Sequence, residues 1–136
     1  MKQYAADKVS LIVDGTPMTG LAEGSFITVG RVTESATLHV GADGKGTMVI
    51  NADKSGTFVA RFAQSSLSNA VLSALEATHA VFPVILKDTN GNSLHSGAKG
   101  FVSAMPSSDY AQELSTREWT IIVESLIHFE GGNPDV

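Results

Sequence analysis

Apolar and polar residues alternate along most of this 136-residue chain. Alternation with a period of two indicates strands that place one face against a core, and Gly, Asn and Asp separate the alternating segments. Asp14-Gly15 and Asn90-Gly91 are strong signals for tight turns between antiparallel strands. The expected strands are residues 8–13, 25–32, 47–50, 57–63, 82–88, 93–96, 100–105 and 115–129. The pattern therefore predicts a mainly β fold, an antiparallel β-sandwich or open barrel of about seven or eight strands.

The last expected strand, from Ser115 to Phe129, is unusually long. We expect one strand of about a dozen residues, whereas most strands have about half that length. Five of its six odd positions from Trp119 to Phe129 are apolar, so the odd face is predicted to be core with Trp119 buried. The even face mixes charged and large aliphatic residues, which favours contact beyond the domain, most simply with another copy. Its main members are Glu118, Ile122, Glu124 and Leu126.

One segment has helical periodicity. Apolar or small residues recur at helical spacing after Ser65-Ser66, either of which can cap a helix. The expected core-facing residues are Leu67, Ala70, Val71, Ala74, Leu75 and Thr78. We therefore expect one amphipathic helix at about residues 66–78, lying against a sheet.

Residues 31–46 contain no convincing element. This stretch has few core-sized side chains and three glycines, at positions 41, 44 and 46. Long loops in compact domains are usually functional or disordered. Two interpretations remain open here: a hairpin without a role, or an extended arm that becomes ordered against a neighbouring subunit.

Composition limits the possible classes of function. The length predicts a single domain over residues 1–136, large enough for a core without disulfides. The chain has no cysteine, which excludes thiol nucleophiles and disulfide frameworks, and its net charge of −5 disfavours binding to nucleic acid or an anionic membrane. Lys8 interrupts the N-terminal segment before an apolar stretch can form, so we expect a soluble protein that no cleaved signal exports.

Catalytic and metal-binding patterns are absent from the sequence. The glycines near Lys45 do not have P-loop spacing, and no Gly-x-Ser-x-Gly motif occurs. The four histidines have no metal-ligand spacing; they are His39, His79, His95 and His128. Glu118 and Glu124 would lie about 20 Å apart on one strand, too far for a glycosidase pair. We therefore predict no enzyme, no catalytic residue, no metal and no cofactor.

An ordered series of segments resembles the tail tube proteins of contractile-tailed (myovirus-type) bacteriophages. The segments are Gly20 to Val29, Leu38 to Gly44, Asn51 to Thr57, Ser68 to Leu75, Phe82 to Asp88 and Ser115 to Thr120. Together they cover nearly the whole chain, and Ser-Thr-Arg-Glu-Trp-Thr at 115–120 is the most distinctive. The resemblance implies a β-sandwich or open barrel with one helix, a fold shared with type VI secretion tube proteins.

The same resemblance implies a structural virion protein located in the tail and assembled in the bacterial cytoplasm. Hexameric rings would stack into an inner tube that serves as a conduit for DNA ejection. The implied partners are the sheath, tape-measure, baseplate and tail terminator proteins, with double-stranded DNA passing through without specific binding and no membrane contact.

Two groups of residues are candidates for the contacts in such a tube. We expect the 31–46 arm to make contacts between rings or subunits, and the even face of the last strand to meet the lumen, the helix or an adjacent copy. The arm candidates are Glu34, His39, Asp43 and Lys45, and the strand candidates are Glu118, Ile122, Glu124 and Leu126.

Three other functions remain open at the sequence level. The first is a β-sandwich binding or adhesion module, which would be a monomer or small closed oligomer. The second is the tube of a secretion or bacteriocin particle, and the third is a hydrolase whose dispersed residues meet only in the fold.

Overall fold

The computed structural model describes residues 9–21, 27–108, 110 and 115–132. The strands are β1 Val9–Val13, β2 Thr16–Pro17, β3 Ile27–Arg31, β4 Ala36–Val40, β5 Gly46–Ile50, β6 Gly56–Ala63, β7 Phe82–Asp88, β8 Ser93–Ala104, β9 Thr116–Val123 and β10 Leu126–Phe129, and the helix is α1 Ser68–Ala77. The mainly β, antiparallel fold with one helix is confirmed. Parts of two expected strands, at Lys8 and at residues 25–26, lie outside the described residues.

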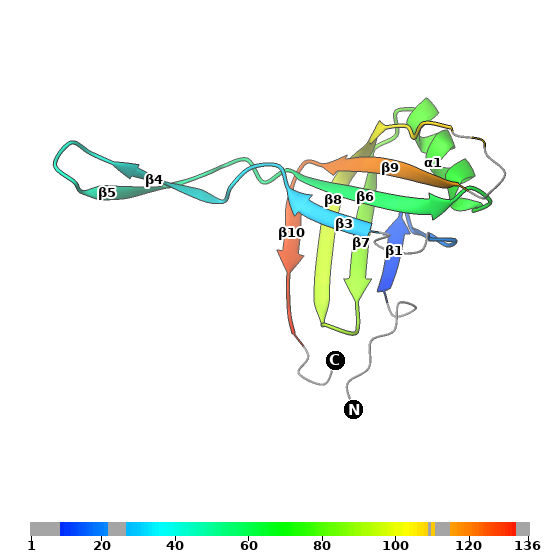
Figure 1. Ribbon diagram of the computed structural model, residues 1–136, viewed down its shortest axis with the longest axis horizontal. Helices are drawn as coiled ribbons and strands as arrows, with labels where there is room; N and C mark the ends of the chain where they lie inside the picture. The colour runs from blue at the N-terminus through cyan, green and yellow to red at the C-terminus, as the bar shows by residue number, and fades with distance from the viewer. Residues whose placement is uncertain (1–8, 22–26, 109, 111–114, 133–136) are drawn as a thin grey trace.

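Eight strands form one bent antiparallel sheet. Its order is β2-β1-β7-β8-β9-β6-β3, and β10 also pairs with β8. Figure 1 shows that β3, β6 and β9 run across the view, whereas β1, β7, β8 and β10 are oriented vertically in it. The 12-residue β8 joins the two halves, because its first part pairs with β10 and its second part pairs with β9. The halves face each other like the layers of an open sandwich.

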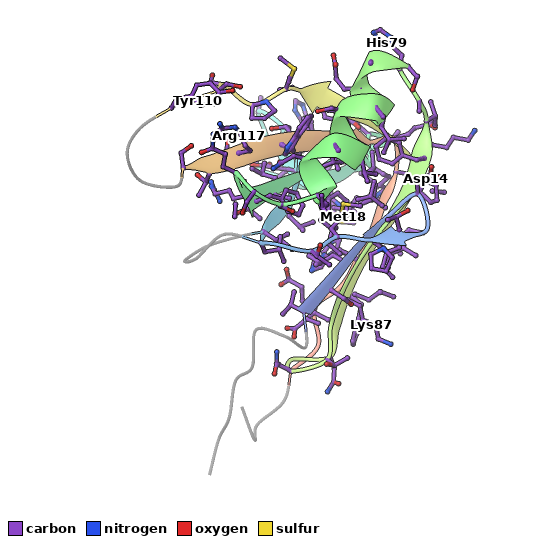
Figure 2. The ribbon with its side chains drawn as sticks, turned by 90° about the vertical axis from the view of Figure 1, so that its right-hand side faces the viewer. Asp14, Met18, His79, Lys87, Tyr110 and Arg117 are labelled. Atoms are coloured by element: carbon purple, nitrogen blue, oxygen red, sulfur yellow. The ribbon has the colours of Figure 1, made fainter. Side chains whose placement is uncertain are left out.

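The core lies between these halves. Along β6 and β9 every second residue is buried, and Phe58, Phe62 and Trp119 are almost completely inaccessible. The opposite wall is β1 and β7, which contribute Leu11, Val13, Phe82, Val84 and Leu86. Figure 2 shows α1 across one end, with Met18 near it. The indole Nε1 of Trp119 donates a hydrogen bond of 3.0 Å to Asn69 Oδ1 on this helix, which anchors α1 to β9.

Glycines allow the two halves to approach closely. A Cβ atom at Gly97 would lie 2.6 Å from the Val123 side chain, and one at Gly56 would lie 2.6 Å from Leu126. Carbon atoms in contact normally lie about 3.5–4.0 Å apart. The sheet therefore folds tightly at these positions only because the side chains are missing there.

The expected strand at 115–129 is wrong as a single element. The chain bends at Glu124 and Ser125 and so divides the segment into β9 and β10. The bend changes which alternate positions face inward: Val123 and Leu126 are both buried, whereas Ile127 and Phe129 are exposed. The odd face is therefore core only in β9, where Trp119 is buried as predicted.

Other boundaries also differ from expectation. The expected strands at 93–96 and 100–105 form one strand, β8, which ends at Ala104, because Gly97 and Gly100 continue the sheet instead of ending it. The helix is confirmed, but its inward face is rotated by about one residue. Leu67 is 82% exposed, whereas Ser68 and Leu72 are buried. Ser66 accepts a hydrogen bond from the Ser68 amide, although the helix itself has no side-chain cap.

Candidate assembly surfaces

A two-stranded arm projects from the body of the molecule. It consists of β4 and β5, residues 36–50, which pair only with each other and extend away from the sheet in Figure 1. Its turn is closed by a hydrogen bond of 2.9 Å from the Gly41 amide to the Lys45 carbonyl, with Gly44 at φ +82°. Of the expected loop or arm at 31–46, residues 36–46 belong to this hairpin, Arg31 ends β3, and the expected strand at 47–50 is confirmed as part of β5.

One face of the arm is apolar and exposed. Cross-strand pairing aligns Leu38 with Met48 and Ala36 with Ile50, and Val40 lies on the same face. Leu38 is 72% exposed, Met48 68% and Ile50 67%. A two-stranded hairpin is at best marginally stable by itself. Complete burial of one such side chain is worth about 1.5–3 kcal/mol, and Leu38, Val40, Met48 and Ile50 are between 53% and 72% exposed, so covering all four would contribute about 4–8 kcal/mol. The arm is therefore suited to a contact with another surface.

Three of the four arm candidates lie on this hairpin, and the fourth lies at its root. Glu34 lies at the arm's root, His39 lies in β4 on the face opposite Leu38, and Asp43 and Lys45 lie in the turn. Asp43 Oδ1 accepts a hydrogen bond of 3.1 Å from the Lys45 amide, so the carboxylate shapes the turn. The four residues are exposed. Their contacts with a second subunit remain a prediction.

A second apolar surface lies on the outer side of β7, β8 and β10. In the register of these strands Ile85, Ser96 and Ile127 form one row, and Lys87, Leu94 and Phe129 form the next. We call Ile85, Leu94, Ile127 and Phe129 the apolar patch; Ile127 is 69% exposed and Phe129 63%. Large apolar groups gathered on a surface mark interaction sites. Lys87, labelled in Figure 2, borders this patch well below the helix.

The outer side of β3, β6 and β9 is polar by comparison. Thr28, Val59 and Thr120 form one row across it, and a salt bridge of 2.9 Å joins Arg61 to Glu118 in another. Ile122 is half-buried beside Phe101 of β8. We call this surface the polar face. Its paired charges and hydroxyl groups need no protein cover.

The even-face candidates do not form a single surface. Glu118 and Ile122 lie on the polar face, and Glu124 is exposed at the bend, where its amide donates a hydrogen bond of 2.9 Å to the Lys99 carbonyl. Leu126 is only 2% exposed and packs over Gly56 in the core. Its predicted place on a lumen or subunit face is wrong, because the bend turns residue 126 inward.

A pocket of about 300 Å³ lies at the root of the arm. Arg31, Glu34, His95, His128 and Glu130 are among the residues that line it. His95 and His128 stack with ring centroids 6.0 Å apart, and an Arg31 guanidinium nitrogen donates a hydrogen bond of 2.9 Å to the Leu126 carbonyl. Burial lowers the pKa of His95; Glu130 opposes this shift and His128 adds to it. The pocket therefore links the arm's root to a histidine that resists protonation.

Among the described residues, no group of three or more histidine, cysteine or acidic side chains could hold a metal ion. No helix in the described part of the chain is long and apolar enough to cross a membrane.

Sequence reasoning missed most of the residues that form these surfaces. A usable signal did exist in the first half of the arm, where Ala36, Leu38 and Val40 alternate with polar residues before the Gly41–Gly44 turn; after the turn Met48, Val49 and Ile50 form a continuous apolar run. No such signal marks Ile127 and Phe129, because their exposure depends on the bend before β10.

Comparison with known proteins supports a structural role. No family model matches this chain. Structural protein ORF10 of Pseudomonas phage KPP10 is 30% identical over 146 aligned positions, which cover 98% of this chain and 84% of that protein.

The fold also occurs in solved structures of contractile injection systems. One is the anti-feeding prophage cap, described as an AFP tube terminating cap, with a TM-score of 0.62, 8% identity and coverage of 96% of this chain and 95% of that chain. Two others come from an extracellular contractile injection system called PVC, in the extended state, and both have a TM-score of 0.56 and 10% identity. The sheath/tube terminator match covers 95% of this chain and 98% of the other, and the sheath-tube complex match covers 94% and 92%. At these identities the likeness shows a shared fold. On its sequence relationship over nearly its whole length, the chain belongs to the family of phage structural proteins that includes structural protein ORF10 of Pseudomonas phage KPP10.

Proposed function

We propose that this protein forms the inner tail tube of a contractile-tailed phage. In this proposal copies of the chain assemble into hexameric rings, and the rings stack inside a sheath as a conduit for DNA ejection. The observation that carries the proposal is the projecting arm, whose apolar face is not covered by any part of the chain that the structure describes. Such an arm is suited to a heterologous contact, and repeated heterologous contacts generate rings or open tubes.

Unpaired sheet edges give further support. Within the described part of the chain β10 pairs only with β8, and β3 pairs only with β6. Exposed edges favour pairing with another chain, and a closed barrel of several subunits removes them. A sheet that continues from one subunit to the next would therefore suit this fold.

The polar face is the best candidate for the lumen. It carries Thr28, Thr120 and the Arg61–Glu118 ion pair, without a cluster of unpaired basic residues. DNA binding requires such clusters because they neutralise phosphates. A face with paired charges would let DNA slide past, in agreement with a net charge of −5 for the chain. Glu118 and Ile122 would then face the channel.

The test is electron microscopy of the purified protein in negative stain. We expect tubes of many rings, roughly 100 Å wide, the size of six such domains around a channel. Deleting arm residues 36–50 should give a folded protein that makes no tubes. A variant with Thr120→Ser on the polar face is the control and should assemble normally. Normal tubes after the deletion, or a discrete monomer of the unmodified protein at high concentration, would refute the proposal.

A tube terminator is the second candidate, because two of the matched structures are described as terminators. A terminator ends a tube and would form single rings that do not stack. Single rings of the unmodified protein at every concentration would favour this alternative over the tube.

A further inference from the structure

We propose that the apolar patch on β7, β8 and β10 is the docking site for the arm of a second copy of this chain. The inference deepens the proposed function and rests on its premise that copies of the chain assemble. The surfaces involved are Leu38, Val40, Met48 and Ile50 on the arm and Ile85, Leu94, Ile127 and Phe129 on the patch.

The two surfaces match in chemistry. Each presents four large apolar side chains, and neither set contains a charged group. On the patch, the only charged residue in the two paired rows is Lys87, at the border. A highly charged partner would not bury the apolar side chains of either surface. Contact between the arm and the patch removes both sets of side chains from water.

The two surfaces also match in size. Three neighbouring strands span about 10 Å, and a two-stranded hairpin is about 5 Å wide, so the patch has room for both arm strands. The arm strands have five residues each, which corresponds to a length of about 17 Å. Stacked sheets pack about 10 Å apart, a spacing that lets Leu38 and Met48 reach between Ile127 and Leu94.

The arm that docks on the apolar patch must come from another copy of the chain. The arm leaves the body beyond the end of β3 and points away from the sheet, as Figure 1 shows, so it does not cover the patch of its own chain. Arm and patch are different surfaces, which makes the contact heterologous and leaves a free arm and a free patch at the two ends of any dimer. The same contact can therefore be repeated along a tube.

The absence of cysteine from this chain permits a direct test by site-directed thiol cross-linking. Met48→Cys in the arm and Ile127→Cys in the patch are prepared as separate proteins with different affinity tags, mixed and treated with a short bismaleimide. Stacked sheets lie about 10 Å apart, beyond the Cα separation of about 4.4–6.8 Å that a disulfide requires, so the reagent must span the gap between the two thiols. We expect a dimer of unlike copies in several-fold higher yield than with Thr120→Cys on the polar face as the second partner. Equal yields from the two pairs would overturn the inference.

An assembly assay separates this inference from the proposed function. Ile127→Asp places a charge at the patch and should reduce assembly at least several-fold while the circular dichroism spectrum stays unchanged; Thr120→Asp on the polar face should leave assembly intact. If Ile127→Asp assembles normally into tubes, the docking site is wrong and the tube proposal stands. If the unmodified protein makes no tubes and the arm–patch cross-link still forms selectively, the docking site stands and the tube proposal fails.

Discussion

Gly97 is the residue whose substitution tests the bent sheet most directly. It lies in β8, where the two halves of the sheet meet, and is buried. In a Gly97→Ala variant the new Cβ would lie 2.6 Å from Val123 Cβ, 2.6 Å from Cγ1 and 2.9 Å from Cγ2. These separations are shorter than a carbon–carbon contact by about 1 Å. Either β8 or β9 must move.

The expected loss of stability follows from this overlap. Overpacking a well-packed core by one methyl group typically costs about 1–3 kcal/mol. We place Gly97→Ala near the upper end, at about 2–3 kcal/mol, because three atoms of Val123 are involved and Val123 is fully buried. With a urea m-value of about 2 kcal/mol per molar, the midpoint of unfolding should fall by about 1–1.5 M.

Two other strand glycines provide graded controls. A Cβ at Gly100 would lie 2.9 Å from Val123 Cγ1 and 3.3 Å from both the Phe82 carbonyl oxygen and Val84 Cγ2, a milder overlap than at Gly97, so Gly100→Ala should cost about 1–2 kcal/mol. A Cβ at Gly30 would meet nothing within 4 Å. Gly30→Ala should therefore be neutral or stabilising by up to about 1 kcal/mol, because alanine loses less backbone entropy than glycine on folding.

The assay is urea unfolding followed by fluorescence. The chain has one tryptophan, Trp119, which is 2% exposed and becomes solvated on unfolding. The predicted order of midpoints is Gly30→Ala highest, then Gly100→Ala, then Gly97→Ala. A Gly97→Ala midpoint equal to that of Gly30→Ala would refute the close approach of β8 to Val123.

Three further predictions concern single side chains. Because burial lowers the pKa of His95, the unfolded chain takes up a proton at this residue before the folded chain does as pH falls through about 6.5, so the folded state should lose stability there. The measurement is the urea midpoint at about pH 7.5 and at about pH 5.5. The midpoint should fall less between these two values for His95→Gln than for His39→Gln on the exposed arm. Trp119→Phe leaves Asn69 Oδ1 without its donor and should lower the free energy of unfolding by about 1–3 kcal/mol, measured by circular dichroism during urea unfolding. A smaller loss would mean that this bond does not anchor α1. Glu118→Gln breaks a half-exposed ion pair with an arginine on β6 and should change stability by less than about 1 kcal/mol, a limit that urea unfolding can test.

The alternation of residues predicted the two strands that form most of the core. Phe58, Ala60 and Phe62 were expected on one face of a strand, and all three are buried in β6. The Asp14-Gly15 turn is also confirmed, with positive φ at both residues, and the Asn90-Gly91 signal correctly marks the hairpin between β7 and β8. These features depend on contacts close in sequence, so local patterns report them well.

The errors arose where distant contacts decide the structure. The bend between β9 and β10 is held by hydrogen bonds from the Glu124 amide to the Lys99 carbonyl and from the Leu126 amide to the Lys54 carbonyl. The alternation of residues 115–129 does not depend on Lys54 or Lys99, so it could not predict the bend. One extra residue at the bend reverses the facing of every later side chain, which moves Leu126 into the core and Ile127 to the surface.

Of the candidate surfaces, the arm could be predicted in part from the sequence and the apolar patch could not. Of the arm candidates, His39, Asp43 and Lys45 lie on one projecting hairpin and Glu34 lies at its root; the strand at 47–50 was expected, whereas β4, its pairing with β5 and the apolar face were not. The apolar patch could not be found from sequence, because Ile85, Leu94 and Ile127 come from three segments that only the strand register brings together.

The sequence by itself therefore determined the mainly β class, the single helix, the principal turns and the absence of recognisable catalytic motifs. The tertiary structure decided which apolar residues remain uncovered, since that depends on what lies opposite each face. Leu38 and Leu126 are the same type of residue in alternating segments, yet one is 72% exposed on an isolated hairpin and the other is 2% exposed between two layers. Only the arrangement of the strands in space distinguishes a residue available for assembly from one that holds the fold together.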